Sequence, residues 1–413
     1  MGSRARLIKL LQDIRASYWF LPSSLVICAM ILAWATLFLD RHVGDLGFDL
    51  PAFLKNTQVD GARTVMSIVS ESSFGVAGVM FSMTMVAVSF ASGNFGPRLI
   101  GNFMRDRGNQ WSLGILVATF VYALLITRAI QTATPDDAQT AIEAFVPHIS
   151  IFTALLLMTV SVFVVIYFVH HIPETINVSN ITASLGARLC DALRNRIEEQ
   201  QEENRDGTRI DWAERSADLS LTLGVSGYIQ TLNKAELSKL AREHNLLIEV
   251  TAPVGTFVTP DTAVLRAWGQ VQDGISESDL INCFASGNSR TEHQNLLFIV
   301  DQLVEMIARA LSPGVNDPFT AINCMNWLFS AMVVAANHRG GLTETPDGRV
   351  RISEVTFLRL LEQGFAQSRP YTKSDPLTDA HLQELLARME REITTLRHLK
   401  TLRSFRRTLD KAE

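Results

Sequence analysis

Several kinds of residue are scarce in this sequence of 413 residues, and each scarcity excludes a class of site. Only four cysteines occur, Cys28, Cys190, Cys283 and Cys324, and no two of them form a CxxC pair. Without paired spacing, we expect neither a structural disulfide nor a zinc site, and we interpret all four as reduced, buried thiols. The formal net charge of -5 is small, and nothing in the sequence indicates a nucleic-acid-binding surface.

The sequence also lacks the motifs of common catalytic and metal centres. It contains no phosphate-binding loop, no catalytic triad pattern and no metal-ligand spacing. No cluster of nucleophile, base or metal-binding residues can be recognised. We therefore predict a protein that is not an enzyme and that binds neither a metal nor a cofactor.

Charged residues are nearly absent from four long apolar segments, although they make up 19% of the whole chain. A transmembrane helix requires about 20 mostly apolar residues. The segments that meet this requirement lie at about 18–39, 72–92, 111–130 and 148–169. The first is too long for a cleaved signal peptide, so we predict a four-span transmembrane domain over residues 1–173.

Basic residues are distributed unevenly between the connections, which predicts the orientation in the membrane. The N-terminal leader and the second connection are basic, whereas Thr132–Pro147 contains no lysine or arginine. The basic residues are Arg4, Arg6, Lys9, Arg15, Arg98, Arg105 and Arg107. Because basic loops remain in the cytoplasm, we expect both termini there, and the second connection next to anionic lipid head groups.

The basic second connection has a helical pattern of its own. Asn94 and Pro97 suit the start of a helix, and the apolar residues between Leu99 and Met104 share one face. This pattern predicts a short helix at the membrane interface. An ordinary loop anchored by its arginines is the alternative.

The second apolar segment carries small and hydroxyl-bearing residues on one helical face. They are Gly75, Gly78, Ser82, Ser89 and Gly93. Small residues allow helices to approach closely, so tight packing within one bundle accounts for the pattern. The functional alternative is that this face lines a polar path across the membrane, as in channels.

Ionisable side chains stand at the ends of the apolar segments. Glu71 precedes the second segment and Arg128 ends the third, and we expect both at similar depth on the outer side. Such charges are functional candidates. In an oligomer, a ring of Glu71 would favour cations and a ring of Arg128 would favour anions. The alternative is that each side chain extends to the membrane interface without a functional role. His170 and His171 end the fourth segment and are candidates for sensing pH, or simply interfacial residues.

Beyond Glu174 the chain has the composition of a soluble domain. We predict a helix with a small β module over 174–270, a helical region over 271–340 and a C-terminal helical region over 341–413. The predicted strands are Gly227–Leu232, Leu246–Val250 and Ala263–Trp268, and Asn233 caps a helix that ends near Glu243. The spacing is similar to that of barrel-sandwich modules, but Thr256–Thr262 contains no lysine that could carry lipoyl or biotin.

Four further helices are predicted, and a compact turn joins the second of them to the third. They are predicted at Glu277–Phe284, Asn295–Leu311, Thr320–Ala336 and Thr378–Leu409. Before the third of them, Asp317 suits a helix cap, which makes a rigid interhelical turn the simpler interpretation. The alternative is a site for a small molecule or ion, formed by Arg290, Thr291, Asp301, Asn316 and Asp317.

The last predicted helix has a heptad-like pattern. Its apolar residues are spaced four and three apart at Leu382, Leu386, Met389, Ile393 and Leu396. This spacing is typical of the seam of a short coiled coil, and we favour self-association through it. Packing of the same residues on their own domain is the alternative.

Four stretches carry a resemblance to a known family. They are VSFASGNFGPRLIGNFMRDRGNQWSLGILVATFVYALLITR, SGYIQTLN, ASGNSRTEHQ and IARALSPGVNDPFTAINC. They resemble the signature stretches of a bacterial family of predicted inner-membrane proteins of unknown function, from the first apolar segment to about Ala336. The resemblance implies a bacterial inner-membrane protein with four spans and a cytoplasmic domain, and it implies no substrate.

Two functions fit these observations. The first is an oligomeric ion channel or small-solute transporter, which would have the lipid bilayer, further copies of the chain and inorganic ions as partners, and whose cytoplasmic domain gates or senses. The second is a membrane-anchored sensor or scaffold without a pore. If Gly75, Ser82 and Ser89 pack against the third or fourth span of the same chain, the channel hypothesis loses support.

Overall fold

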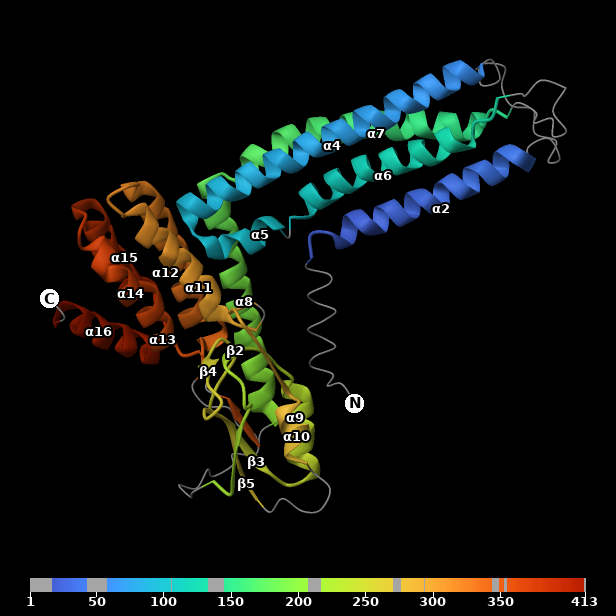
Figure 1. The fold of residues 1–413 in the computed structure, drawn as a ribbon. Helices are drawn as coiled ribbons and strands as arrows, with labels where there is room; N and C mark the ends of the chain where they lie inside the picture. Colours follow the sequence, from blue (N-terminus) through green and yellow to red (C-terminus); the bar gives the residue numbers. More distant parts are fainter. Residues whose placement is uncertain are drawn as a thin grey trace. The chain divides into compact units, whose positions relative to one another are not determined.

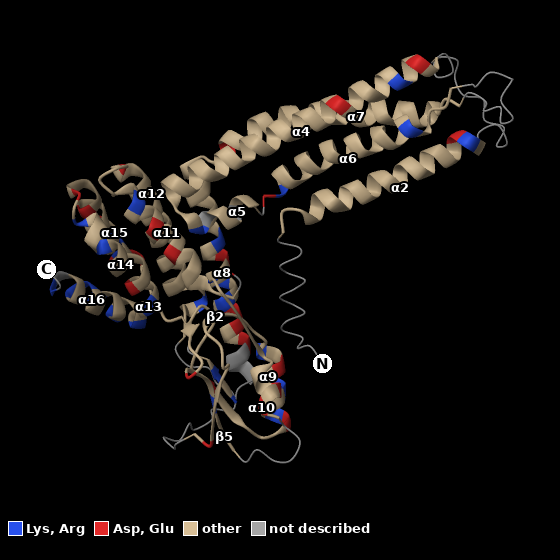
Figure 2. Cartoon of the chain, viewed as in Figure 1, with Lys and Arg blue, Asp and Glu red and all other residues tan. Residues whose placement is uncertain are grey.

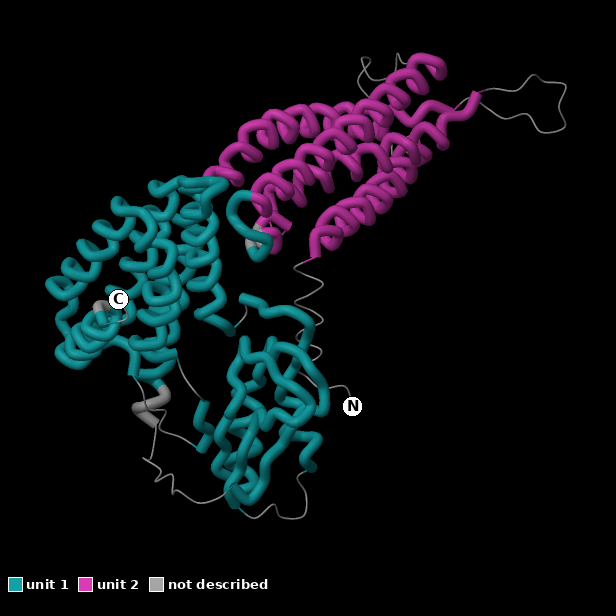
Figure 3. Tube along the Cα trace, turned by 60° about the vertical axis from the view of Figure 1, so that its left-hand side comes forward, with its two compact units in different colours: residues 1–12, 94–98, 178–413 teal, residues 13–93, 99–177 magenta. Residues whose placement is uncertain are grey.

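A computed structural model of the chain describes residues 17–42, 58–104, 106–132, 145–206, 217–269, 276–292, 294–343, 349–352 and 355–411. The basic leader, Arg105 and residues 133–144 of the third connection lie outside this described part. The chain divides into two compact units (Figure 3). Unit 2 contains Asp13–Gly93 and Leu99–Asn177, and the described residues of unit 1 belong to Asn94–Arg98 and Val178–Glu413.

Unit 2 consists of long apolar helices that lie side by side (Figure 1). They are α2 (Phe20–His42), α4 (Val59–Phe95), α6 (Arg107–Ala129) and α7 (His148–Thr175), each long and apolar enough to cross a membrane. The predicted short helix is also found, as a 3-10 turn at Pro97–Leu99 followed by α5 (Ile100–Met104). At 37 residues α4 is far longer than the predicted segment; at about 1.5 Å per residue it spans roughly 55 Å, against a hydrocarbon core of about 30 Å.

The interior of unit 2 combines apolar packing with a few polar contacts between helices. Met66 of α4 packs with Ile126 of α6, Ala33 of α2 and Ala154 of α7 in one cluster. Within it, the Tyr122 hydroxyl donates to the Ser150 carbonyl at 3.1 Å and lies 2.8 Å from the Thr36 hydroxyl. Buried hydroxyl contacts of this kind are typical of helices that pack within a membrane.

A side chain distant in sequence caps the start of α7. The two carboxylate oxygens of Asp40, at the end of α2, accept from the backbone nitrogens of Ile149 and Ser150 at 2.8 and 2.9 Å. Pro147 offers no side-chain cap there. The first turn of a helix has unpaired N–H groups and a positive dipole end, so this carboxylate fastens α2 to α7.

A fifth apolar helix, α12 (Pro318–Asn337), belongs to unit 1, so five described helices are candidate membrane spans where the sequence predicted four. Half of its most apolar window is buried inside the chain. It packs against α8 (Val178–Asp206), α11 (Leu296–Ala310) and α15 (Pro376–Glu392). A helix that is apolar on all sides is expected in a protein core as well as in a membrane.

The β module of unit 1 contains two sheets around one core. One sheet has the order β1 (Leu219–Thr222), β5 (Ala263–Trp268), β3 (Leu247–Val250), β7 (Val350–Ile352), and the other β4 (Phe257–Val258), β2 (Gly227–Leu232), β6 (Phe284–Gly287). The predicted strands are confirmed, as is Asn233 capping α9 (Lys234–Glu243). A barrel-sandwich topology is not established, since β7 from the C-terminal region joins β3 in parallel.

One helix of this region was predicted too long. Helix α10 spans only Glu277–Ile281, and Phe284, the predicted last residue of the helix, begins β6. Phe284 pairs with Leu232 of β2 in antiparallel register. The core of the β module therefore takes Phe284 in an extended conformation, overriding the local helical pattern.

From residue 355 to 411 the C-terminal region is mostly helical, and two separate helices replace the single predicted one. After α13 (Phe357–Leu361), a π-helical turn (Glu362–Ala366) and α14 (Gln367–Thr372), helix α15 ends at Glu392 and α16 (Leu396–Lys411) begins. The predicted seam residues Leu382, Leu386, Met389 and Ile393 are buried in unit 1, whereas Leu396 is 74% exposed. The coiled-coil prediction is wrong, because α15 uses this stripe to pack against α12 and α16.

The cysteine prediction holds for three of the four thiols. Cys190, Cys283 and Cys324 are buried and unpaired, whereas Cys28 is exposed on α2. Burial raises the pKa of Cys283 to about 11, assisted by the nearby carboxylates of Glu236 and Asp279. This thiol therefore stays protonated and unreactive near neutral pH.

Candidate functional site

The small residues of α4 lie on a face that no other described helix of the chain covers. Gly75, Gly78, Ser82, Ser89 and Gly93 are all exposed. A Cβ atom built on Gly75, Gly78 or Gly93 would meet nothing within 4 Å. The opposite stripe of α4 is buried, and it includes Met66, Ala77, Met80 and Ala87. The small residues are therefore not explained by close packing inside this single chain.

Glu71 lies on the same open face. It lies about one helical turn from Gly75 and two turns from Gly78, and Ser67 donates to its carboxylate at 2.9 Å. The rings of Phe74 and Phe120 are 4.8 Å apart, and Arg63 donates to the Ile130 carbonyl at 3.1 Å. These two contacts align α4 antiparallel to α6 and place Glu71 level with about Ala123.

Arg128 lies at a different level from Glu71. It is exposed in the last turn of α6, five residues beyond Ala123, which corresponds to roughly 7–8 Å along the axis. No ion pair joins Arg128 to Glu71, both of which the structure describes. The expectation of similar depth in a membrane stays a prediction, but along the bundle the two residues differ in level, and α4 continues as a helix for about three turns on the N-terminal side of Glu71.

The two histidines at the end of α7 have different surroundings. His171 lies 2.7 Å from a carboxylate oxygen of Asp106 and is 18% exposed, with the Tyr167 ring stacked on it at 5.0 Å. The same Asp106 caps α6 by accepting from Asn109 N at 3.1 Å. His170 is 79% exposed and lies 3.3 Å from Glu174. Of the two pH-sensing candidates, His171 is thus the one that joins two helices, α6 and α7.

The residues that follow α4 are held by unit 1. Arg98 pairs with Glu305 of α11 at 3.5 Å, and Gln302 of α11 donates to the Arg98 carbonyl at 3.2 Å. Gly96 has φ +117°, and a Cβ there would lie 2.6 Å from the Glu305 carboxylate. The positive φ favours glycine here, and a Cβ would also displace the Glu305 carboxylate.

The candidate ligand residues of unit 1 divide into two groups. Arg290 pairs with Asp301, which is 6% exposed, and Gln363 of the π-helical turn donates to the other carboxylate oxygen. Thr291 is half-buried in the adjoining loop. Both oxygens of Asp301 are thus engaged in a buried ion pair, whereas Arg290 Nε is buried without a hydrogen-bond partner.

Asn316 and Asp317 lie beyond the other end of α11 and do not join this group. Asp317 caps α12, since its carboxylate accepts from Thr320 N at 3.2 Å, and its own backbone nitrogen donates to the Ala310 carbonyl at 2.7 Å. Asn316 is exposed, with a left-handed φ of +48°. The five candidates therefore do not form one site, and the interpretation of a rigid capped turn accounts for this pair.

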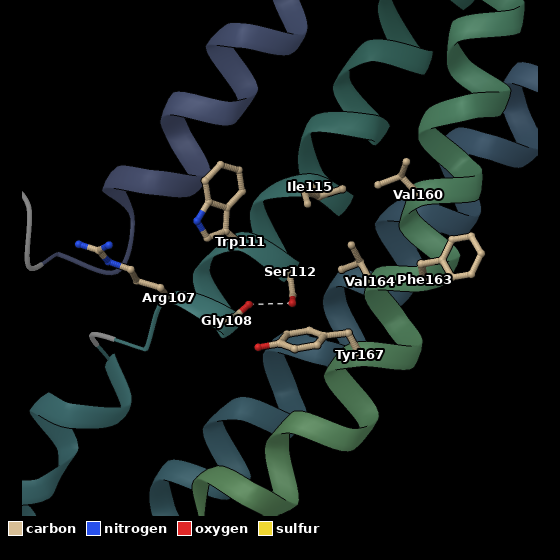
Figure 4. A pocket seen from close by; sticks show the side chains of 9 residues that line it. All are labelled: Arg107, Gly108, Trp111, Ser112, Ile115, Val160, Phe163, Val164 and Tyr167. Atoms are coloured by element: carbon tan, nitrogen blue, oxygen red, sulfur yellow. Dashed lines mark hydrogen bonds between the residues drawn. The ribbon is translucent and has the colours of Figure 1, made fainter. Parts of the chain in front are cut away.

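A groove of about 460 Å³ lies between α6 and α7, beside the first turns of α6 (Figure 4). Its apolar lining is Trp111, Ile115, Val160, Phe163 and Val164, and its polar lining is Arg107, Gly108, Ser112 and Tyr167. Ser112 donates to the Gly108 carbonyl at 2.7 Å. The polar groups lie at one end of the groove and the apolar side chains fill the rest of its wall.

Charges of both signs are sparse along the helices of unit 2 and cluster near their ends, whereas unit 1 is rich in both (Figure 2). This distribution is expected for helices surrounded by lipid. A comparison with family models finds a match over residues 15–388 to DUF2254, described as predicted membrane protein. The chain belongs to this family.

Curated relatives of this DUF2254 protein carry no assigned activity. Uncharacterized proteins of Mycobacterium bovis and of one strain of Mycobacterium tuberculosis are 29% identical over 340 residues, or 79% of this chain. A protein of another M. tuberculosis strain is 28% identical over the same length. The aligned region covers 63% of each relative, so these relatives are longer proteins. No solved structure matches.

Several residues of these sites could not be recognised in the sequence of this family member. Asp40 lies in the last turn of α2 and Asp106 in the connection before α6, and their roles depend on partners distant in sequence, Ser150 and His171. Gln363 reaches Asp301 only because a π-helical turn places it there. The one local signal was Asp106 followed by a helical run, which is typical of an N-cap.

Proposed function

We propose that this protein is an oligomeric channel or small-solute transporter of the bacterial inner membrane, in which α4 helices of several copies line a path for inorganic cations. The proposal rests on one observation. The face of α4 that carries Glu71 and the small residues is exposed in the single chain, while the opposite face is buried.

Exposure of this face of α4 to lipid is energetically unfavourable. A carboxylate within a span costs several kcal/mol when it faces hydrocarbon, and ionisable residues in spans usually face a bundle interior or a water-filled cavity. Glu71 is level with about Ala123, which lies roughly 9 Å along the helix axis from the last residue of α6. Covering this face with α4 of a second copy removes the exposure, and Gly75 and Gly78 allow close approach.

The proposed topology has four spans with both termini in the cytoplasm. The helices of unit 2 cross the membrane, and α12 stays in the core of unit 1, where half of its apolar window is already buried. Arg98 and Arg107 flank α5 at the proposed cytoplasmic end, as the positive-inside tendency requires. The C-terminal unit then lies in the cytoplasm as one regulatory domain.

Glu71 rather than Arg128 supplies the selectivity in this proposal. Glu71 shares its face with the small residues, whereas Arg128 lies in the last turn of a different helix. A ring of carboxylates in a narrow path favours cations over anions. Arg128 then serves as an interfacial anchor, whose side chain extends to the lipid head groups.

Unit 1 has a direct means of regulating α4 in this proposal. The last two residues of α4 and the three that follow belong to unit 1, and α11 holds them through Gln302 and Glu305. Asp301 precedes Gln302 on the same helix and carries the buried pair with Arg290. A ligand or partner that shifts α11 would therefore act on the end of the path-lining helix.

The test is ion flux from liposomes that contain the purified protein, with K⁺ and Cl⁻ gradients applied separately. We expect K⁺ flux to exceed Cl⁻ flux, and Glu71→Gln to reduce K⁺ flux at least tenfold. Arg128→Gln, the matched control at the end of α6, should leave K⁺ flux unchanged. Absence of flux under every gradient, pH and voltage would contradict the proposal and favour the membrane-anchored sensor without a pore.

A further inference from the structure

We propose that the groove between α6 and α7 binds one anionic phospholipid, with an acyl chain along its apolar wall and the phosphate at Arg107. The proposal takes from the previous section only the placement of unit 2 in the membrane with the Arg107 end at the cytoplasmic leaflet. It does not depend on the existence of a pore.

The shape and lining of the groove fit a lipid chain. Its volume of about 460 Å³ lies within the roughly 300–1,000 Å³ of small-ligand sites. Trp111 and Phe163 are 48% and 66% exposed, and Val160 between them is 40% exposed, so the groove opens outward from the bundle. In a bilayer, an open apolar groove at this position is filled by hydrocarbon.

The polar end of the groove fits a phosphate group. Figure 4 shows Arg107 at this end, with its guanidinium directed away from the apolar side chains, and the Tyr167 hydroxyl directed toward Gly108. Within the described residues, neither Arg107 nor the Tyr167 hydroxyl has a hydrogen-bond partner. Arginine binds phosphate through two parallel hydrogen bonds, and tryptophan and tyrosine are enriched at the level of lipid head groups.

The neighbouring acidic group does not compete for Arg107. One carboxylate oxygen of Asp106, Oδ2, accepts from Asn109 N and lies 2.7 Å from His171, and among the described residues Asp106 forms no ion pair with Arg107. Ser112 is likewise engaged, because it donates to the Gly108 carbonyl. Arg107 is thus the charged group of the groove that remains available, and its sign selects an anionic lipid at the inner leaflet.

The test uses the full chain in detergent and measures lipid retention by native mass spectrometry, with phosphatidylglycerol and phosphatidylcholine of identical acyl chains as probes. We expect one tightly held phosphatidylglycerol per chain and about tenfold weaker retention of phosphatidylcholine. Arg107→Gln should remove this preference, a loss of about tenfold or ~1.4 kcal/mol. Arg128→Gln, an exposed arginine at the other end of α6, is the matched control and should keep it.

A second variant tests the location independently of the charge. Val160→Trp places a large ring in the groove from an exposed position, so the fold is retained and retention of both lipids should fall. Equal retention of the two lipids by the wild type, an unchanged preference in Arg107→Gln, or wild-type retention in Val160→Trp would each overturn the proposal. Gel filtration and the unfolding temperature without added lipid confirm that the variants are folded. Lipid retention is measured without ion flux, so the lipid proposal can fail or succeed independently of the proposed channel.

Discussion

Helices α4 and α12 are both long and apolar, yet the chain surrounds them differently. In the most apolar window of α12 half of the residues are buried by the rest of the chain, against 28% in α4. Helix α12 buries one broad face, which includes Ala321, Met325, Leu328, Ala331 and Ala335, and most of its other residues are half-buried. Helix α4 buries one stripe and exposes the rest. Apolar length alone therefore does not separate a core helix from a membrane span.

The exposed surfaces of the two helices also differ in kind. A helix that faces only lipid should expose large apolar side chains, as α7 does with Phe163, Ile166 and Val169. Helix α4 exposes Val79 and Val86 but also Glu71, Ser82 and Ser89. In the proposed function, α4 of a second copy covers the polar and small residues of this surface, and lipid covers the large apolar ones.

The largest expected effect comes from adding a tryptophan to the exposed face of α4, compared with adding one to the exposed face of α7. Ser82→Trp should abolish K⁺ flux, because an indole at this position fills the proposed path, while the protein folds and assembles normally. Val162→Trp adds the same ring to α7 at a position that is 48% exposed, and flux should continue there. Liposome flux together with gel filtration measures both results. Normal flux through a correctly assembled Ser82→Trp protein would remove α4 from the path.

A second substitution pair tests the contrast between a protein-covered and an uncovered helix. Leu328→Ala in α12 removes a fully buried side chain and should cost about 2–5 kcal/mol. Ile68→Ala in α4 truncates a side chain that is 56% exposed and should change stability by less than about 0.5 kcal/mol. Amide hydrogen exchange in α8 and α12 measures the first, because these helices pack together in unit 1. Equal costs at the two positions would show that α4 is as covered as α12.

Much of the fold could be predicted because its signals are local. Hydropathy located the four helices of unit 2, and Asn233 and Asp317 cap helices as their positions suggest. The errors arise where partners distant in sequence decide. Phe284 is extended because β2 pairs with it, and the stripe of Leu382 and Leu386 is covered by helices of the same unit rather than by a second chain.

The site was predictable only in part, for the same reason. The small-residue face of α4 follows from helical periodicity, and the structure places all five residues on one exposed face. The level of Glu71 relative to Arg128 could not be read from sequence, since it depends on the pairing of Phe74 with Phe120. The separation of Asn316 and Asp317 from Asp301 depends likewise on the length and direction of α11.

The smallest expected effect concerns the C-terminal end of α4, where the exposed part of the helix gives way to buried residues. Its last residue, Phe95, is 9% exposed, and Gly96 follows with a conformation that disfavours a side chain. Gly96→Ala combines a positive φ with a contact to Glu305, so we expect a local cost of about 1–2 kcal/mol. Because the segment holds α4 to α11, flux should keep its selectivity but change in magnitude by several-fold. Gly101→Ala is the matched control, since a Cβ there meets nothing within 4 Å. A Gly96→Ala protein with wild-type flux and wild-type protection of the α11 amides would show that this segment does not couple unit 1 to α4.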